Sequence, residues 1–356
     1  MERYYIEVPE SALDSMMYDL WDHNYVNAKL KTATNKLSVK LALRGNQLRE
    51  HKKKSYHIIF DKPFLFQGQH EIHLNAEYND PSIIRNKLSF DFFKSIGVLA
   101  PASKHVLLYI NGIFEGIYLI LESFDQYYLQ NHSLPKGTIY YATNNDANFS
   151  LYTPEKELKS SLEDGYTKKV DFQKDDSLKK LLIAINTFPQ EKFRVEINTI
   201  LDVQKYLKWL TGVVCVQNFD GFIHNYALYQ NSDTGLFEIT PWDYDGSWGR
   251  DLHGRYLEYD YIPIEGYNSL TARLLDCSYF KNLYGSILDE ILQKQFTQQY
   301  LEPIIEEILQ SIRPFIHKDP YLKHKEINLN EEKDFILRYI HERNNYLRNS
   351  LSSFMQ

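Results

Sequence analysis

The chain has 356 residues, more than a single hydrophobic core usually organises, so its length favours two packed lobes or domains. Hydrophobic residues make up 43% of it and charged residues 24%, which is typical of a globular protein. The formal net charge of -7 argues against a nucleic-acid-binding protein and leaves room for a basic partner.

Membrane, secreted and zinc-binding classes are also disfavoured. No run of 18 apolar residues occurs, and residues 1–5 lack the basic-then-apolar layout of a signal peptide, so we expect a soluble protein made in the cytoplasm without a membrane partner. The two cysteines, Cys215 and Cys277, form neither a disulfide framework nor a zinc-ligand spacing. Glycine is scarce, with 15 residues against the usual ~7% of a chain, so we do not expect a glycine-rich phosphate loop.

Alternating apolar residues and turn signals fill the first third of the chain and predict an antiparallel sheet. The expected strands are Tyr4–Val8, Tyr25–Leu30, Leu37–Leu43, Ser55–Phe60, His105–Ile110 and Ile113–Leu121. One helix is expected among them, with Asp80 as its N-cap, Pro81 at its first position and Gly97 as its C-terminal stop. Residues 1–123 are therefore predicted to form a β-rich N-terminal lobe.

From about Asp125 helical periodicity takes over, and residues 124–356 are predicted to form a mainly helical C-terminal lobe. Within it, Thr138–Thr143 is predicted to be a strand and residues 144–178 a polar surface loop. A long helix is expected from Val203, after the N-cap candidate Asp202. The predicted fold class is therefore α+β.

One segment of this second lobe carries a pattern that points to chemistry. Asp220 follows the long helix, Asn225 comes five residues later, and two short expected strands, Tyr226–Tyr229 and Leu236–Thr240, lead to Asp243. Protein kinases place their active-site residues in this order. Their first Asp accepts the proton of the attacking hydroxyl, while the Asn and the later Asp hold Mg²⁺ on the nucleotide phosphates. Carboxylate and amide oxygens are the hard ligands that Mg²⁺ prefers.

The spacing between Asp220 and Asn225 is weak by itself, because it recurs twice near residue 20 of the same chain. The helix before it and the hairpin after it favour the kinase interpretation. Asp243 and Asp245 lie between two tryptophans, which suggests a partly desolvated metal site, since unpaired carboxylates are costly to bury. Ordinary turn carboxylates and a calcium-like surface site remain the alternatives for both.

Five ordered motifs resemble those of the CotH family, atypical protein kinases best known from the spore coat of Bacillus species. The motifs are Arg44-Gly45-Asn46 with Lys53-Lys54-Ser55-Tyr56, residues 79–86, Gly116-Ile117-Tyr118 with Glu122, Asn218-Phe219-Asp220 with Asn225-Tyr226, and Pro241-Trp242-Asp243-Tyr244-Asp245. The resemblance runs from about residue 35 to residue 250. It implies an atypical protein-kinase-like fold with two lobes, in which residues 1–123 bind the nucleotide and residues 124–356 carry the catalytic residues.

The resemblance also implies a role for each matching residue of the second lobe. Asp220 would be the catalytic-loop aspartate, and Asn225 and Asp243 would bind metal. Tyr244-Asp245 replaces the usual Phe-Gly after the metal-binding Asp, and Asp245 would supply a further ligand or a supporting contact. ATP and Mg²⁺, or Mn²⁺ in its place, are the implied cofactors.

A kinase also needs cationic side chains to neutralise the nucleotide phosphates, and we expect the first lobe to supply them. Lys53 and Lys54 are candidates, and alternation along a strand allows only one of them to face the nucleotide, without indicating which. Because no G-x-G-x-x-G motif occurs, Arg44 is expected to bind phosphate where a typical kinase uses backbone amides. A basic surface hairpin is the plainer interpretation of the loop that follows Arg44.

Three further assignments are open. Arg85, on the predicted helix, is a second candidate for phosphate binding. That helix contains no Glu to hold the lysine, so Glu77 before it and Asp91 within it are the acidic candidates. Glu122 occupies the place of the hinge that reads adenine, although it could equally be a plain edge-strand carboxylate.

The function implied is transfer of the ATP γ-phosphate to Ser or Thr residues of basic, Ser-rich coat proteins, needed for outer-coat assembly. Such a protein would be synthesised in the mother-cell cytoplasm and assembled into the spore coat. The acidic, aromatic segment 251–267 and the negative net charge suit a basic partner. Two alternatives stay open: a structural coat protein on a kinase-like scaffold, and an enzyme of the same fold that transfers AMP.

Overall fold

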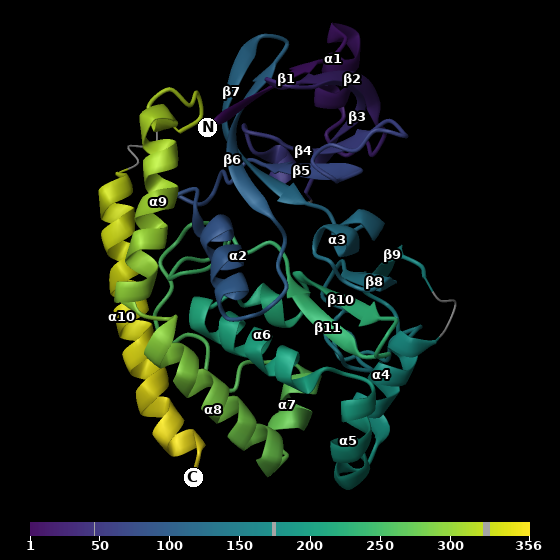
Figure 1. The fold of residues 1–356 in the computed structure, drawn as a ribbon, viewed down its shortest axis with the longest axis vertical. Helices are drawn as coiled ribbons and strands as arrows, with labels where there is room; N and C mark the ends of the chain where they lie inside the picture. Colours follow the sequence, from purple (N-terminus) through teal and green to yellow (C-terminus); the bar gives the residue numbers. More distant parts are fainter. Residues whose placement is uncertain (46, 173–175, 323–327) are drawn as a thin grey trace.

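The computed structural model of the chain describes residues 1–45, 47–172, 176–322 and 328–356 (Figure 1). Asn46, part of one of the predicted motifs, lies outside the described residues. The strands are β1 (Glu2–Glu7), β2 (Val26–Lys31), β3 (Lys36–Arg44), β4 (Ser55–Phe60), β5 (Glu71–Asn75), β6 (Ser103–Ile110), β7 (Ile113–Glu122), β8 (Gly137–Ala142), β9 (Tyr166–Val170), β10 (Tyr226–Asn231) and β11 (Phe237–Pro241). The α-helices are α1 (Glu10–Tyr18), α2 (Arg85–Ser95), α3 (Gln126–Asn131), α4 (Ser177–Thr187), α5 (Gln190–Glu196), α6 (Val203–Val216), α7 (Ser269–Leu275), α8 (Ser278–Lys294), α9 (Gln298–Ile316) and α10 (Leu329–Phe354).

The first seven strands close into a barrel in the order β1-β2-β3-β4-β5-β7-β6, drawn at the top of Figure 1. Neighbouring strands are antiparallel except β1 and β6, which run parallel. Side chains alternate in direction along each strand, so every second one faces the inside of the barrel. Tyr4, Leu41, Ile58 and Leu74 are among these and are fully buried. Closure leaves no unpaired sheet edge, and it gives the barrel a hydrophobic core of its own.

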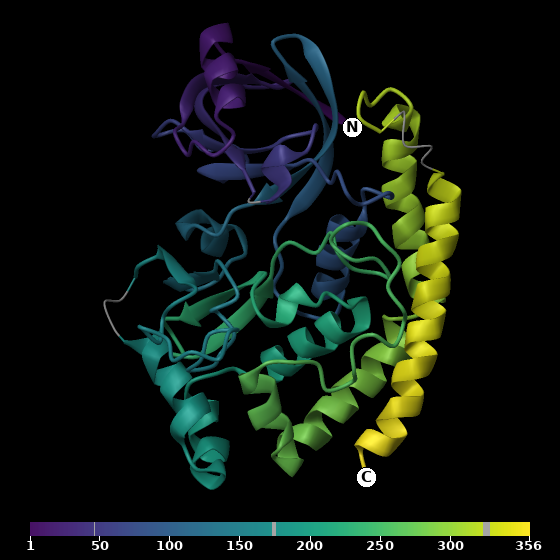
Figure 2. The ribbon, with the colours of Figure 1, turned by 180° about the vertical axis from the view of Figure 1, so that it is seen from behind.

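A second, larger core joins the helices to the sheet β11-β10-β8-β9 and to the outer face of the barrel. Helix α2 belongs to this core: Phe93 lies against Gly212 of α6, although α2 falls in the predicted N-terminal lobe. Figures 1 and 2 show α9 and α10 side by side along one edge of the molecule, with α9 reaching the barrel. The predicted α+β fold with a β-rich and a helical part is confirmed, whereas the boundary at residue 123 stays a prediction.

The structure corrects several predicted elements. Helix α2 begins at Arg85 and not at Pro81, because Asp80 forms a turn in which its carboxylate accepts the amides of Ser82 and Arg85. Strand β9 lies inside the predicted 144–178 loop, where it adds a fourth strand to the second sheet. Helix α1 and strand β5 were not predicted. Within the described ranges, no helix is both long and apolar enough to cross a membrane.

Candidate active site

The segment after α6 is shaped by side-chain amides. The helix ends at Gln217, whose φ of 58° turns the chain sharply, and a short 3₁₀ turn then presents Asp220. Asn218 and Asn225 each donate an amide hydrogen bond, both of 3.1 Å, to the backbone carbonyl of Asp243. These two bonds fix the loop that carries Asp220 to the loop that carries Asp243, so residues 25 positions apart in the sequence are held together.

The predicted catalytic and metal-binding residues meet in one cavity of about 660 Å³. Asp220, Asn225, Asp243 and Asp245 all line it. Asp243 has a φ of 59°, a conformation that costs energy for a residue other than glycine, and such conformations are often kept where a side chain must be aimed. The structure therefore brings these four residues together, while their chemical roles remain a proposal.

A smaller adjoining cavity of about 420 Å³ lies between the barrel and the helical part. Asp243 and Asp245, which follow β11, line one side of it. Arg44, Glu77 and Lys53 are among the residues that line it from the barrel. The Arg44 guanidinium donates a hydrogen bond to Asn75 and lies 5.6 Å from the centre of the Trp242 ring. The structure thus places Arg44, a predicted phosphate-binding cation, in the same cavity as two of the predicted metal ligands.

Negative charge accumulates around these cavities. Burial, and after it the neighbouring Asp243 and Asp80, raises the pKa of Asp245 to about 8. Burial and repulsion by Asp245 raise the pKa of Glu77 well above its ordinary value. Burial also raises the pKa of Asp220, and the charge of Asp243 adds to that rise. A group of oxygen donors that repel one another in this way suits a divalent cation, and Asn225, Asp243 and Asp245, which line the same cavity, could hold Mg²⁺ or Mn²⁺.

Both candidate lysines have their ammonium groups bound to other parts of the protein; Lys53 lines the smaller cavity, and Lys54 lines neither. Lys53 donates to Asp319 over 3.0 Å and to the carbonyl of Ile117 over 2.6 Å, and both charged side chains are fully buried. Lys54 donates to the carbonyl of Arg49 over 2.5 Å. Asp319 lies 266 residues from Lys53 in the chain, so no local pattern could have indicated this pairing.

Arg85, the other candidate for phosphate binding, lines neither of the two cavities. Its fully buried guanidinium pairs with Asp80 and with Glu332, 2.9 Å away on α10, and its Nε donates to the carbonyl of Ser247 over 3.0 Å. The side chain therefore joins α2 to α10 as part of the packing. Asp91, the other acidic candidate on α2, pairs with Lys87.

Glu122 makes structural hydrogen bonds at the junction between β7 and α3. Its carboxylate accepts from the amide of Ala102, from Asn131 and from His132 over 2.8–3.1 Å. Its own backbone N–H donates to the carbonyl of Ala102 over 3.0 Å, so that group is not available to a nucleobase. These contacts favour a structural role for Glu122 over the hinge interpretation, although β7 pairs with both β5 and β6 and is not an edge strand.

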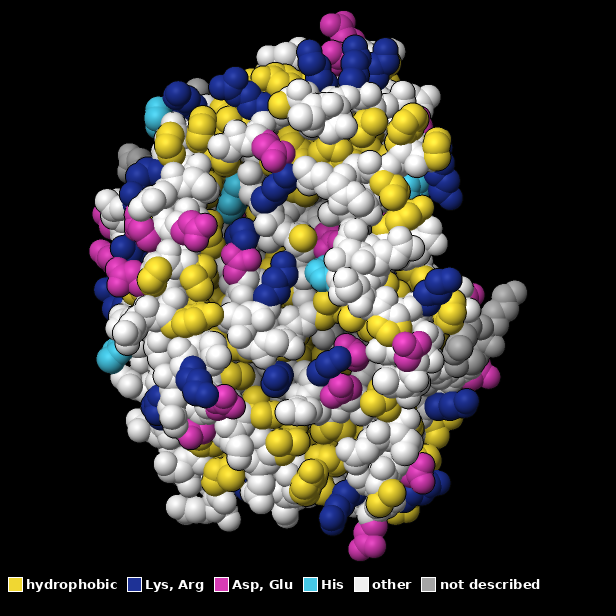
Figure 3. Space-filling view, in the orientation of Figure 1, with side chains coloured by type: hydrophobic (Ala, Val, Ile, Leu, Met, Phe, Trp, Pro, Cys, Tyr) yellow, Lys and Arg dark blue, Asp and Glu magenta, His cyan; other side chains and the backbone are white. Residues whose placement is uncertain are grey.

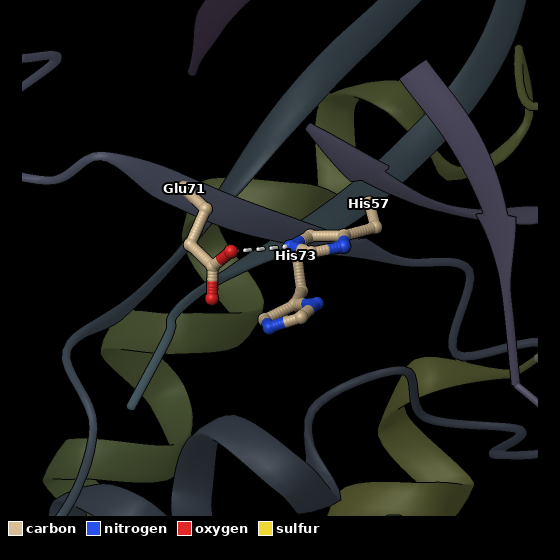
Figure 4. Close-up of side chains that lie close together, drawn as sticks. All are labelled: His57, Glu71 and His73. Carbon is tan, nitrogen blue, oxygen red and sulfur yellow. Dashed lines mark ion pairs between the residues drawn. The ribbon is translucent and has the colours of Figure 1, made fainter. Parts of the chain in front are cut away.

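A cluster that the sequence analysis did not anticipate lies on the outer face of β4 and β5 (Figure 4). His57 Nε2 lies 3.2 Å from a Glu71 oxygen, and the rings of His57 and His73 stack with their centres 4.5 Å apart. Burial favours the neutral acid, but the hydrogen bond and charge of His57 outweigh it and lower the pKa of Glu71 to about 2. These three side chains could hold a metal ion, since their ligand atoms lie within 4.8 Å of one another. Hydrogen bonds to Tyr25 and Ser123 already link them into a chain.

Comparison with known proteins identifies the family of the chain. The protein family described as "CotH kinase protein" matches residues 41–347. The chain belongs to the CotH kinase family. It is 47% identical to the inner spore coat protein H of Bacillus subtilis (strain 168) over 351 residues, covering 98% of this chain and 97% of that protein. It is also 30% identical to the inner spore coat protein H-like protein of the same organism, over 84% of this chain and 86% of that one.

Two solved structures show a more distant likeness. One is the complex of the Shewanella oneidensis MR-1 toxin HipA with HipB and operator DNA, with a TM-score of 0.44 and 11% identity over 99% of this chain and 74% of that one. The other is the Helicobacter pylori proinflammatory kinase CtkA, with a TM-score of 0.40 and 11% identity over 84% of this chain and 93% of that one. At such values neither protein informs the chemistry of the CotH chain.

Proposed function

We propose that this chain is an Mg²⁺- or Mn²⁺-dependent protein kinase that transfers the γ-phosphate of ATP to serine or threonine hydroxyls. The observation that carries the proposal is the convergence of Asp220, Asn225 and Asp243 on one cavity, which adjoins a second cavity carrying Arg44. Membership of the CotH kinase family supports the same function.

Each residue has a distinct task in this reaction. Asp220 accepts the proton of the acceptor hydroxyl as its oxygen bonds to the γ-phosphorus and the bond to the β–γ bridging oxygen breaks, releasing ADP. Asn225, Asp243 and Asp245 hold the metal, whose charge offsets that of the phosphate oxygens when it is bound. Arg44 binds phosphate from the barrel side, and Asn218 keeps the loops of Asp220 and Asp243 in register.

The proposed acceptors are basic, Ser-rich proteins of the spore coat, and the proposed place of action is the coat, after synthesis in the cytoplasm. The names of the two Bacillus relatives support the location. Asp251, Leu252 and Tyr261 line the larger cavity beside Asp220, so the acidic, aromatic segment begins at the site itself. Figure 3 shows Lys and Arg interspersed with Asp and Glu over the face seen in Figure 1, so the case for a basic acceptor rests on this local segment.

The test uses the purified full-length chain with Mg²⁺ or Mn²⁺, a basic Ser-rich protein, and ATP labelled at either the γ- or the α-phosphate. We expect transfer of the γ-label alone. Asp243→Ala should abolish metal-dependent nucleotide binding. Asp220→Asn should leave that binding intact and slow transfer by about 10²–10⁴-fold, the usual contribution of a general base. Asp233→Asn, on the exposed turn of the same hairpin, is the matched control and should behave as wild type.

Other outcomes would point to different functions. Transfer of the α-label alone would replace the kinase with an enzyme that transfers AMP. Failure to transfer either label to an authentic coat substrate would favour a structural role. Equal loss of nucleotide binding in the Asp220 and Asp243 variants would contradict the separate roles given to them.

A further inference from the structure

A buried carboxylate reaches the predicted metal site from the barrel side. Glu77 follows β5 and is 6% exposed, and it lines the smaller cavity together with Asp243 and Asp245, which follow β11. The two elements belong to different sheets. The cavity is therefore bounded by carboxylates from both parts of the molecule.

The orientation of Glu77 is fixed by one side chain. Asn86 donates its amide to Glu77 Oε1 over 3.2 Å, and its own oxygen accepts the backbone N–H of Tyr244 over 3.0 Å. Tyr244 lies between Asp243 and Asp245, so Asn86 ties Glu77 to the loop that carries them. In the described part of the chain, the second oxygen of Glu77, Oε2, is buried and has no hydrogen-bond partner.

The cations that surround Glu77 are paired with other groups. Lys53 is bound to Asp319, and Arg85 is bound to Asp80 and Glu332. Arg44 donates to Asn75 and stacks on Trp242. A buried, charged carboxylate oxygen with neither a hydrogen-bond donor nor a paired cation is costly. Protonation relieves that cost in the metal-free chain, and a bound metal ion relieves it when the carboxylate is charged.

We propose that Glu77 Oε2 is a direct ligand of a divalent cation shared with Asp243 and Asp245. Carboxylate oxygens with room for water molecules are the donors that Mg²⁺ and Mn²⁺ prefer. The inference rests on the proposed metal-dependent function and adds to it a ligand from the barrel. The cation then joins the barrel to the helical part, so that loading of the metal and the relative position of the two parts are coupled.

The test measures Mn²⁺ binding to the full-length chain by the loss of the free-ion electron paramagnetic resonance signal, without nucleotide and with ATP. Loss of groups that merely support metal ligands commonly weakens metal affinity about 10–100-fold. Glu77→Gln, which keeps the shape and removes the charge, should therefore weaken Mn²⁺ binding at least about tenfold. Glu77→Asp keeps the charge at a shorter reach and should bind with intermediate affinity.

Asp91→Asn is the matched control, because it also replaces one carboxylate with an amide, on α2, where Asp91 pairs with Lys87. This variant should bind Mn²⁺ as wild type does. Thermal unfolding with a chelator checks folding: Glu77→Gln should unfold no earlier than wild type and should lose the stabilisation that Mn²⁺ gives to wild type. Wild-type affinity in Glu77→Gln would overturn this inference alone. Absence of Mn²⁺ binding by the wild-type chain, with and without ATP, would overturn the proposed metal site as well.

Discussion

Replacing Asp319 with asparagine tests how the C-terminal helices stabilise the barrel. Asp319 follows α9, and one of its oxygens accepts both Lys53 Nζ, at 3.0 Å, and the amide of Ile117, at 2.8 Å. Neither charged side chain is exposed to solvent. Burial lowers the pKa of Lys53, and the charge of Asp319 acts against that change. The substitution keeps the shape of the side chain and leaves a buried ammonium group without its counter-charge.

Breaking a buried ion pair by removing one partner usually costs about 3–5 kcal/mol. At about 2.1 cal/mol/K per residue, the unfolding entropy of a 356-residue chain is roughly 0.75 kcal/mol/K, so the expected drop in Tm is about 4–7 °C. Urea titration followed by tryptophan fluorescence measures the free energy of unfolding, and differential scanning calorimetry measures Tm.

Two further variants separate the charge effect from other causes. Adding Lys53→Met to Asp319→Asn removes the unpaired ammonium and should recover much of the lost stability. Glu290→Gln removes one partner of an exposed ion pair on α8 and should leave Tm unchanged. A free-energy loss below about 1 kcal/mol in Asp319→Asn, the range of surface pairs, would refute the reasoning.

Two other predictions follow from the packing and the charges of the site. Gly212→Ala places a methyl group 2.2 Å from the Phe93 ring, so it should lower the free energy of unfolding by about 1–3 kcal/mol despite the better helix propensity of alanine. Gly285→Ala meets the flexible end of Met355 and should leave stability nearly unchanged. Equal Tm values for the two variants would contradict this reasoning. Because the pKa of Asp245 rises from its ordinary 3.8 to about 8, the folded metal-free chain binds more protons than the unfolded chain between these values. The contribution of Asp245 to the free energy of unfolding should therefore fall as pH rises from about 4 to about 8. It is measured as the difference between wild type and Asp245→Asn, because burial lowers the pKa values of His73 and His105 and gives these groups the opposite slope below about pH 6.5. A difference that rises over this range would show the sign to be wrong.

Local patterns predicted much of the secondary structure and the order of the site residues. The alternation in β2, β3, β4, β6 and β7 and the turn between β10 and β11 were readable because side-chain direction repeats every second residue. The start of α2 was predicted four residues too early, because Asp80 and Pro81 resemble a helix N-terminus and the competing turn depends on the contacts of Arg85. Strand β5 is short, and β9 consists largely of polar residues, so neither gave a strong signal.

The sequence by itself determined the α+β class and the family motifs, including the segment that carries Asp220, Asn225 and Asp243. Spacing and periodicity are properties of short segments of the sequence, so they can be read without knowing which other segments pack against them. Only the tertiary structure decided which charged side chain pairs with which. Lys53 pairs with Asp319 and Arg85 with Glu332, because a buried charge is stabilised by an opposite charge close to it in space. Glu77 lies near Asp245 although the two carboxylates repel each other. Such partners can come from any part of the sequence.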